Sequence, residues 1–378
     1  MSPEVSSTAS LVYPDEAIDP DSAIDRTVRM IDTAVPLRNV RPYRVLAPMR
    51  TGQSTTSTAT QPDVIAHDLP SVGVVIATRD RPEAVARALQ AVLAQDYAGE
   101  LRVIVVYDGA PPDYLLSRAL PRPVMVLSNW RAPGLAGTRN TGVLGLDTDL
   151  VAFCGDDDRW SQGKITAQVA ALTARPEAEF VTCAVEVEQR GGVRPRLFGH
   201  ATVGVDDLVR ALAMIQSSTF LVRRDALLGG LGLVAEDAPG SVHEDWDLLL
   251  RAAKRSTVLH VDEPLVRVHP RRPQATAYDY ALRISSLRWM MARHPEIRGC
   301  RPGAARAYGQ LACWSAASGN RRDAWYFSRQ ALRNNWREPR AAIAIAAASG
   351  VVPVDRVLGA LDRRAPHAPA WDNRRRNG

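Results

Sequence analysis

The stretch Val72-Gly-Val-Val-Ile-Ala77 is a continuous apolar run, and the polar segment Thr78-Arg-Asp-Arg-Pro82 follows it directly. Such a run is typical of a strand buried on both faces, as in a parallel sheet. Pro82 is suited to the first turn of a helix. A second apolar run, Arg102-Val-Ile-Val-Val-Tyr107, ends at Asp108-Gly109. The segment therefore predicts a strand–helix–strand unit with a right-handed crossover, and hence a parallel sheet.

Further apolar patterns extend this sheet along the chain. They predict strands over residues 124–127, 150–154, 218–222 and 258–268 (the last interrupted by Pro264), a half-buried strand over 180–188, and helices near 137–146, 165–172, Asp225 and from Glu244 onward. Ligands of such sheets bind beyond the carboxyl ends of the strands. Polar side chains at those ends are therefore the first candidates for a functional site.

Changes of composition divide the chain into three parts. Residues 1–70 predict an N-terminal extension that ends in a flexible linker rich in Thr, Ser and Gln. Residues 71–275 hold the strand and helix patterns of an α/β domain. Residues 276–378 predict a helical region, with helices over 304–317, 321–334 and 339–348, and a disordered tail.

Composition is that of an ordinary globular protein, with 46% hydrophobic and 23% charged residues among 378. The net charge of +6 is compatible with a nucleotide, nucleic acid or an anionic membrane as partner, and equally with a solvated arginine-rich surface. The four cysteines form no CxxC pair, so we expect reduced thiols. No apolar run reaches the ~18 residues of a membrane span, and no secretory signal pattern is evident. These features predict a cytoplasmic protein, with peripheral contact at the inner membrane face left open.

Three polar clusters follow the ends of predicted strands. They are Thr78-Arg-Asp80, Asp108 and the acidic triplet Asp156-Asp157-Asp158. Adjacent carboxylates repel one another, and a divalent cation that holds a phosphate would relieve this repulsion. The clusters therefore predict one site that binds a phosphorylated ligand.

Several familiar nucleotide and hydrolase motifs are missing. The polar segment after Ala77 is not the G-x-G-x-x-G of dinucleotide-binding proteins, and Gly163-Lys164 lacks the spacing of a phosphate-binding loop. His243-Glu244 lacks the second histidine of a zinc protease, and no G-x-S-x-G is present. The remaining interpretation is an α/β protein that binds a nucleotide through carboxylates and a metal ion.

Five segments in order resemble family 2 glycosyltransferases of the GT-A fold: VGVVIATRDRP, VIVVYDG, GLAGTRNTG, LVAFCGDDDRW and HEDWDLLLR, within residues 71–270. The resemblance implies a mixed, mostly parallel sheet flanked by helices, followed here by an all-helical C-terminal region. It also implies an inverting transferase that uses Mg²⁺ or Mn²⁺ and a UDP-, GDP- or dTDP-sugar. The acceptor would be a carbohydrate or a lipid-linked hydroxyl, and no nucleic acid partner is expected.

The resemblance assigns nucleotide-sugar contacts to seven residues. Asp108 would bind the base, and Asp156 the ribose. The loop after the first strand would line the base and ribose through Ala77, Thr78, Arg79 and Asp80. Arg139 would touch the nucleotide or hold the floor of the site, and Asn140 is expected to be structural support. As an alternative, Asp108 is a simple turn aspartate, since Asp-Gly favours turns.

The resemblance also implies metal ligands and a general base. Asp157 would be the main metal ligand, with Asp158 as the alternative, and His269 could lie at the metal or diphosphate. Asp245 would accept the proton of the acceptor hydroxyl. Glu244 is the alternative base, or it orients Trp246 and the acceptor. Two simpler interpretations remain open. Glu244 and Asp245 could be acidic residues that are favoured in the first turn of a helix, and His269 could be a surface histidine before Pro270.

A non-catalytic role is a competing hypothesis. The N-terminal extension and the helical C-terminal region are not required by a small-molecule reaction. A transferase-like domain could instead present these regions to a protein partner. Turnover of a sugar nucleotide is the observation that separates the two hypotheses.

Overall fold

The computed structural model describes residues 69–118, 122–189, 192–211, 215–268 and 277–350, all of which belong to one compact unit. The predicted tail and nearly all of the predicted N-terminal extension lie outside these residues. The expected boundary between residues 275 and 276 stays a prediction. None of the described helices is both long and apolar enough to span a membrane.

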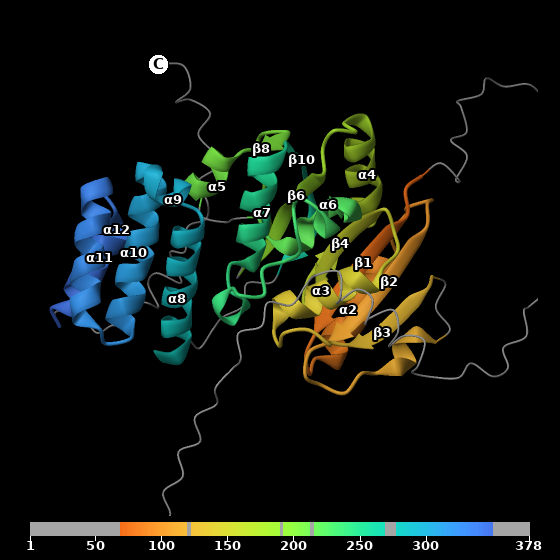
Figure 1. Ribbon diagram of the computed structural model, residues 1–378, viewed down its shortest axis with the longest axis horizontal. Helices are drawn as coiled ribbons and strands as arrows, with labels where there is room; N and C mark the ends of the chain where they lie inside the picture. The colour runs from red at the N-terminus through yellow and green to blue at the C-terminus, as the bar shows by residue number, and fades with distance from the viewer. Residues whose placement is uncertain (1–68, 119–121, 190–191, 212–214, 269–276, 351–378) are drawn as a thin grey trace, which may run out of the picture. The chain divides into compact units, whose positions relative to one another are not determined.

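A ten-stranded mixed sheet organises the transferase-like part of the chain (Figure 1). Its main path runs in the order β3-β2-β1-β4-β9-β6-β10-β5, while β7 pairs with β6 and β8 pairs with β10. The strands are β1 (Val72–Thr78), β2 (Leu101–Tyr107), β3 (Val124–Ser128), β4 (Leu150–Gly155), β5 (Arg159–Trp160), β6 (Phe180–Gln189), β7 (Gly192–Arg196), β8 (Thr202–Val203), β9 (Leu221–Arg223) and β10 (Val258–Val268).

Parallel pairing brings the ends of three strands to the same level. β1 pairs in parallel with both β2 and β4, so that Ala77 lies beside Val106 on one side and Gly155 on the other. β2 and β3 are also parallel, as are β6 and β10, whereas β9 is antiparallel to both β4 and β6. The predicted mixed, mostly parallel sheet is confirmed.

Helices cover both faces of the sheet because successive side chains of a strand point to opposite faces. On one face, Val74 and Ile76 of β1 pack in a core with α2 and α4. On the other face, Val75 belongs to a core shared with α3, α6 and α7. The helices of the α/β part are α2 (Pro82–Leu93), α3 (Leu135–Gly145), α4 (Lys164–Ala174), α5 (Val205–Ala211), α6 (Arg224–Leu228) and α7 (Glu244–Arg255).

A glycine lets α3 lie unusually close to the sheet. A Cβ atom at Gly142 would lie 2.3 Å from Cγ1 of Val75 on β1, well inside van der Waals contact. Any larger residue would push the helix away from the strand. This close approach matters for the site because α3 also carries Arg139 and Asn140.

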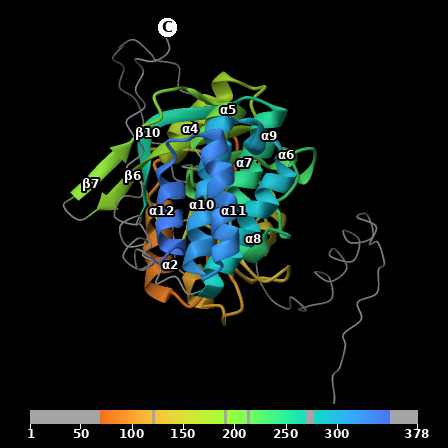
Figure 2. The same ribbon diagram turned by 90° about the vertical axis from the view of Figure 1, so that its left-hand side faces the viewer.

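The described part of the C-terminal region, residues 277–350, contains helices and no strand, as predicted. It comprises α8 (Ala277–Arg293), α9 (Glu296–Gly299), α10 (Arg301–Ala317), α11 (Arg321–Asn334) and α12 (Pro339–Ala348). α10 packs against α8, α11 and α12, and Figure 2 shows this group from the side of α11 and α12. Leu287 and Met290 of α8 and Leu311 of α10 belong to the same core as α7, so the helices are continuous with the α/β part.

Two local predictions were wrong. β6 is not half-buried: six of its first eight residues are buried apolar or cysteine side chains, because β6 lies between β9 and β10 inside the sheet. Residues Ser217–Thr219 form a 3₁₀ turn, η2, and only Leu221–Arg223 pair as a strand. The short elements β5, β7, β8, α5 and α9 had not been predicted. Among the cysteines, all free, Cys154, Cys183 and Cys313 are buried and Cys300 is partly exposed.

Candidate functional site

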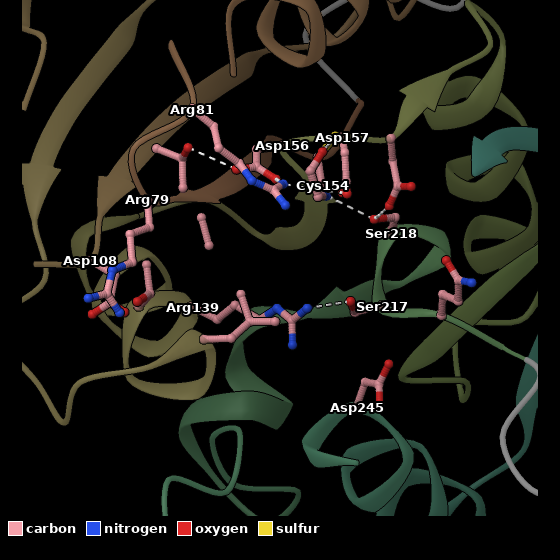
Figure 3. A pocket seen from close by; sticks show the side chains of 17 residues that line it. Arg79, Arg81, Asp108, Arg139, Cys154, Asp156, Asp157, Ser217, Ser218 and Asp245 are labelled. Atoms are coloured by element: carbon pink, nitrogen blue, oxygen red, sulfur yellow. Dashed lines mark hydrogen bonds and ion pairs between the residues drawn. The ribbon is translucent and has the colours of Figure 1, made fainter. Parts of the chain in front are cut away.

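A pocket of about 600 Å³ lies beyond the carboxyl ends of β1, β2 and β4 (Figure 3). The three predicted polar clusters all contribute to it. Its lining residues are Ala77, Thr78, Arg79, Arg81, Asp108, Leu135, Thr138, Arg139, Cys154, Gly155, Asp156, Asp157, Asp158, Gln216, Ser217, Ser218 and Asp245. The volume is within the range of typical small-molecule sites.

The first carboxylate of the acidic triplet is buried and held by the end of β1. Asp156 is 6% exposed and accepts hydrogen bonds from Thr78 Oγ1 at 3.0 Å and from Arg81 Nη1 at 2.6 Å. The same Arg81 nitrogen lies 3.4 Å from Oδ2 of Asp157. The guanidinium of Arg81 therefore offsets part of the negative charge at this edge of the sheet.

The other two carboxylates of the triplet have different surroundings. Asp158 accepts a short hydrogen bond from Ser218 Oγ, and the same oxygen of Ser218 accepts the backbone N–H of Gly155 at 2.9 Å. The side chain of Asp157 is 27% exposed and faces the pocket. Asp157 is thus more open to an incoming ligand than the buried Asp156.

The donor atoms around the triplet suit a hard cation. Carboxylate and hydroxyl oxygens are available, and these are the ligands of Mg²⁺ and Mn²⁺. Burial raises the pKa of the nearby Cys154 thiol well above its usual value, so sulfur does not compete as a thiolate ligand. Within the described ranges, no three or more His, Cys, Asp or Glu residues are arranged as a ready-made metal cage. Mg²⁺ sites in proteins use one or two carboxylates and complete the shell with substrate phosphates and water.

Asp108 is fixed at the end of the pocket that lies opposite the 3₁₀ turn η2. Its carboxylate accepts hydrogen bonds from Asn129 Nδ2 at 3.0 Å and from the backbone N–H of Gly134 at 3.1 Å. Gly134 has a φ of 116°, which favours glycine. Asp108 therefore fastens the start of α3 and still lines the pocket, so its geometry fits both the turn and the binding interpretation.

Arg139 crosses the floor of the pocket, as Figure 3 shows. Its Nη1 donates to Glu244 Oε1 and its Nη2 donates to Ser217 Oγ, each at 2.6 Å. All three side chains are buried. Burial raises the pKa of Glu244, and the charge of Arg139 opposes that rise. The guanidinium is thereby held in one orientation between the acidic triplet and α7.

Asp245 lies on the wall of the pocket across from Asp156 and Asp157 (Figure 3). It is in the first turn of α7, and its Oδ1 accepts the N–H of Trp246 at 2.8 Å. The preceding residue, His243, has a left-handed φ of 66°, which is uncommon for a side chain of this size. The ring of His243 hydrogen-bonds Ser286 of α8 at 2.9 Å, which helps to hold this turn.

The structure brings most of the predicted site residues together. Nine of them line the pocket: Ala77, Thr78, Arg79, Asp108, Arg139, Asp156, Asp157, Asp158 and Asp245. Asp80 is exposed outside the lining, and Glu244 lies behind it, paired with Arg139. His269 falls outside the described residues. Asn140 has the supporting role expected of it, since its amide bonds the backbone of Val234 in both directions.

Sequence reasoning missed several lining residues, of which three make bonds that shape the site. Arg81 belongs to the loop already singled out, and a second arginine in that loop was the available signal. Ser217 and Ser218 gave no signal, because they lie about 60 residues beyond the acidic triplet. They reach it because β9 runs antiparallel to β4 and places η2 beside Gly155.

Residues 73–228 match the family model described as Glycosyl transferase family 2. Over 198 residues the chain is 27% identical to "Uncharacterized glycosyltransferase YwdF" of Bacillus subtilis (strain 168), covering 50% of this chain and 70% of that protein. Among solved structures, residues 1–349 of S. aureus TarS in complex with UDP-GlcNAc align with a TM-score of 0.51 and 15% identity, covering 78% of this chain and 92% of that one. The structural likeness concerns the fold alone, and the family model covers residues 73–228 of the 378 in the chain.

Proposed function

We propose that this chain, whose residues 73–228 match the family 2 glycosyltransferase model, is a glycosyltransferase that transfers a sugar from a nucleotide-diphosphate sugar to an acceptor hydroxyl with inversion at the anomeric carbon. The reaction would serve polysaccharide, glycolipid or natural-product glycosylation. One observation carries the proposal. Asp157 and Asp245 line opposite walls of one pocket large enough for a sugar nucleotide.

The donor would lie along the rim made by β1, β2 and β4. Asp108 would contact the base and Asp156 the ribose, while Ala77 and Thr78 line the space between them. Arg81 places a permanent positive charge beside the acidic triplet, where a diphosphate has to be neutralised, and Arg79 lines the pocket near Asp108. Arg139, fixed by Glu244 and Ser217, would contact the sugar or its phosphate from below.

Asp157 would hold Mg²⁺ or Mn²⁺, with Asp158 as its second carboxylate. The ion, when bound, neutralises charge that develops on the departing diphosphate. Arg81 now faces Asp156 and Asp157 and is close enough to shift toward the diphosphate once the donor enters. The protein therefore supplies both carboxylates for the ion and guanidinium groups for the leaving group.

Asp245 would act as the general base. A carboxylate on the wall opposite the diphosphate takes the proton from the acceptor hydroxyl as that oxygen attacks the anomeric carbon. Attack from the side opposite the leaving group inverts the configuration in a single displacement. The buried ion pair between Arg139 and Glu244 makes Glu244 the less accessible alternative.

Donor binding can be tested by a thermal-shift screen against UDP-, GDP- and dTDP-sugars with and without Mn²⁺. UDP-GlcNAc belongs in the first set, because it is the ligand of the TarS structure with the same fold. A true donor at about a hundred times its Kd stabilises the native state by about 2.7 kcal/mol, which raises Tm by a few degrees. A rise that is larger with Mn²⁺ supports the proposal. No shift with any donor, together with no sugar-nucleotide hydrolysis, would favour the non-catalytic alternative.

Asp157→Ala should weaken Mn²⁺-dependent donor binding at least tenfold by isothermal titration calorimetry, because it removes the carboxylate proposed to hold the ion. Binding measured in EDTA should change much less, since the nucleotide contacts at Asp108 and Asp156 remain. Asp206→Ala is the matched control, because Asp206 is an exposed aspartate in the first turn of α5, away from the pocket. Unchanged Mn²⁺-dependent binding in Asp157→Ala would remove this residue from the metal site.

A further inference from the structure

The positive charge of the protein is concentrated in its C-terminal helices. Residues 277–350 contain twelve arginines, no lysine and four acidic residues, a surplus of eight positive charges, although the whole chain carries +6. The rest of the chain is therefore slightly acidic. Such a local surplus of positive charge indicates a surface that attracts an anionic partner, whereas charge that only improves solubility would be spread over the chain.

The outward side of α11 combines this charge with aromatic rings. Arg322, Trp325, Tyr326, Arg329 and Arg333 follow helical spacing and are all exposed, with Trp325 at 49% and Tyr326 at 55%. The opposite side of the helix, which carries Ala324, Phe327, Ser328 and Ala331, is buried and packs against α10 and α12. We refer to the five exposed residues as the α11 face, and the ribbon of α11 is labelled in Figure 2.

The pattern continues beyond the end of α11. Trp336 is 73% exposed, the largest exposed fraction among the large apolar side chains of the described ranges. The guanidinium of Arg337 stacks over its ring at 4.6 Å from the centroid. An indole and an arginine are thus presented together next to the α11 face.

Acidic side chains do not neutralise this surface. Asp323 accepts the Asn320 amide at the N-terminus of α11, Glu338 pairs with Arg340, and Glu296 pairs with Lys254. Among the described residues, no carboxylate lies within ion-pairing distance of the three arginines of the α11 face. Their charges are therefore available to a partner.

A hollow of about 420 Å³ adjoins the same surface. Arg288 and Arg298 stand exposed at its edge, Tyr326 connects it to the α11 face, and buried apolar walls come from Met291, Leu311 and Phe327. Asp323 also lines the hollow, and its carboxylate accepts the Asn320 amide. A basic edge above an apolar wall matches a molecule that is anionic at one end and apolar at the other.

We propose that the α11 face, with Trp336 and Arg337, docks the protein on the surface of an anionic phospholipid bilayer. Indole and phenol rings have an apolar body and a polar end, and they prefer the headgroup layer of a membrane. Arginines close to an anionic leaflet add electrostatic attraction. The docking is shallow, because the apolar side of α11 is already used inside the protein.

The chemistry favours a bilayer over nucleic acid. Proteins that bind single strands align aromatic rings in a positively charged groove, whereas these rings stand on the outer side of one helix. Helices that enter a DNA groove read bases mainly with arginine and small polar side chains, and two exposed indoles do not suit that role. The inference is independent of the donor and metal assignments proposed above.

The test is sedimentation of the full-length protein with phosphatidylcholine vesicles that contain either no or about 30 mol % phosphatidylglycerol, at about 0.1 M salt. We expect binding only to the anionic vesicles. Each arginine near such a surface strengthens binding about fivefold, so the triple variant Arg322→Glu/Arg329→Glu/Arg333→Glu should bind at least about a hundredfold more weakly. Trp325→Ala/Trp336→Ala should also bind more weakly and should lose quenching by brominated lipid.

The matched control reverses three exposed arginines elsewhere, Arg87→Glu/Arg118→Glu/Arg175→Glu, which changes net charge equally. It should bind more than tenfold more tightly than the triple variant of the α11 face, and circular dichroism should show that both are folded. Equal loss in the two variants would overturn the proposal, because general charge alone would then explain binding. No binding to anionic vesicles would also overturn it, as would a labelled RNA or DNA 20-mer that binds when vesicles do not.

Discussion

Asp245→Asn is expected to lower kcat by about 10²–10⁴ while leaving donor binding nearly unchanged, because an amide cannot accept the proton of the attacking hydroxyl. Asparagine keeps the size of the side chain and can still accept the N–H of Trp246 through its oxygen. The loss should therefore be in chemistry and not in folding. Steady-state transfer assays, with donor affinity measured separately by calorimetry, distinguish the two effects.

Asp206→Asn is the matched control, because Asp206 is also a first-turn aspartate, on α5, and lies away from the pocket. It should retain full activity. If Asp245→Asn also retains full activity, Asp245 is only a first-turn helix residue and the base assignment is wrong. Glu244→Gln then becomes the decisive variant, because Glu244 is the alternative base.

Asp247→Ala is expected to destabilise the fold by about 3–5 kcal/mol, the typical cost of removing one partner from a buried ion pair. Asp247 is fully buried on α7 and accepts hydrogen bonds from Arg251 at 2.8 Å, Arg293 at 2.7 Å and His294 at 2.9 Å. Two of these donors belong to α8 or follow it directly. Alanine would remove the acceptor of the buried His294 ring nitrogen and loosen the attachment of the C-terminal helices to α7.

Urea unfolding at neutral pH measures this loss. Asp237→Ala is the control, since Asp237 also faces Arg293, at 3.8 Å, but its side chain is 64% exposed. Exposed pairs contribute about 0–1 kcal/mol. A loss for Asp247→Ala no larger than that of Asp237→Ala would show that the buried network does not stabilise the junction.

The pH dependence of the unfolding free energy should separate the contribution of the charge of Asp247 from that of its packing. Burial opposes ionisation of Asp247, but hydrogen bonds and charges of His294, Arg251 and Arg293 outweigh it and lower its pKa. A carboxyl with a lowered folded pKa contributes stability above its unfolded pKa, about 3.9, and loses it as pH falls through the folded value. The difference between wild type and Asp247→Ala should therefore shrink below about pH 4.

The same network bears on the proposed base. Asp245 and Asp247 lie in the first turn of α7, so the bonds that Asp247 makes to Arg293 and His294 also constrain the helix that presents Asp245 to the pocket. The bond between His243 and Ser286 adds a second attachment to α8. The helical region thus supports the site mechanically, besides carrying the basic α11 face.

Local pattern determined much of the fold. Apolar runs such as residues 72–77 and 102–107 are typical of strands buried on both faces, and Pro82 is suited to the first turn of a helix, so β1, α2 and β2 were predictable. Because parallel strands end at one edge of a sheet, the convergence of Thr78, Asp108 and Asp156 was predictable as well.

Tertiary structure alone decided the contacts between distant segments. Sequence spacing does not reveal that β9 lies between β4 and β6, and that insertion is what places Ser217 and Ser218 in the pocket and buries β6. The partners of charged groups were equally hidden: Arg81 with Asp156, Arg139 with Glu244, and Asp247 with α8. The physical reason is that periodicity reports which side of an element is buried, whereas the partner of a buried charge depends on which elements pack against it.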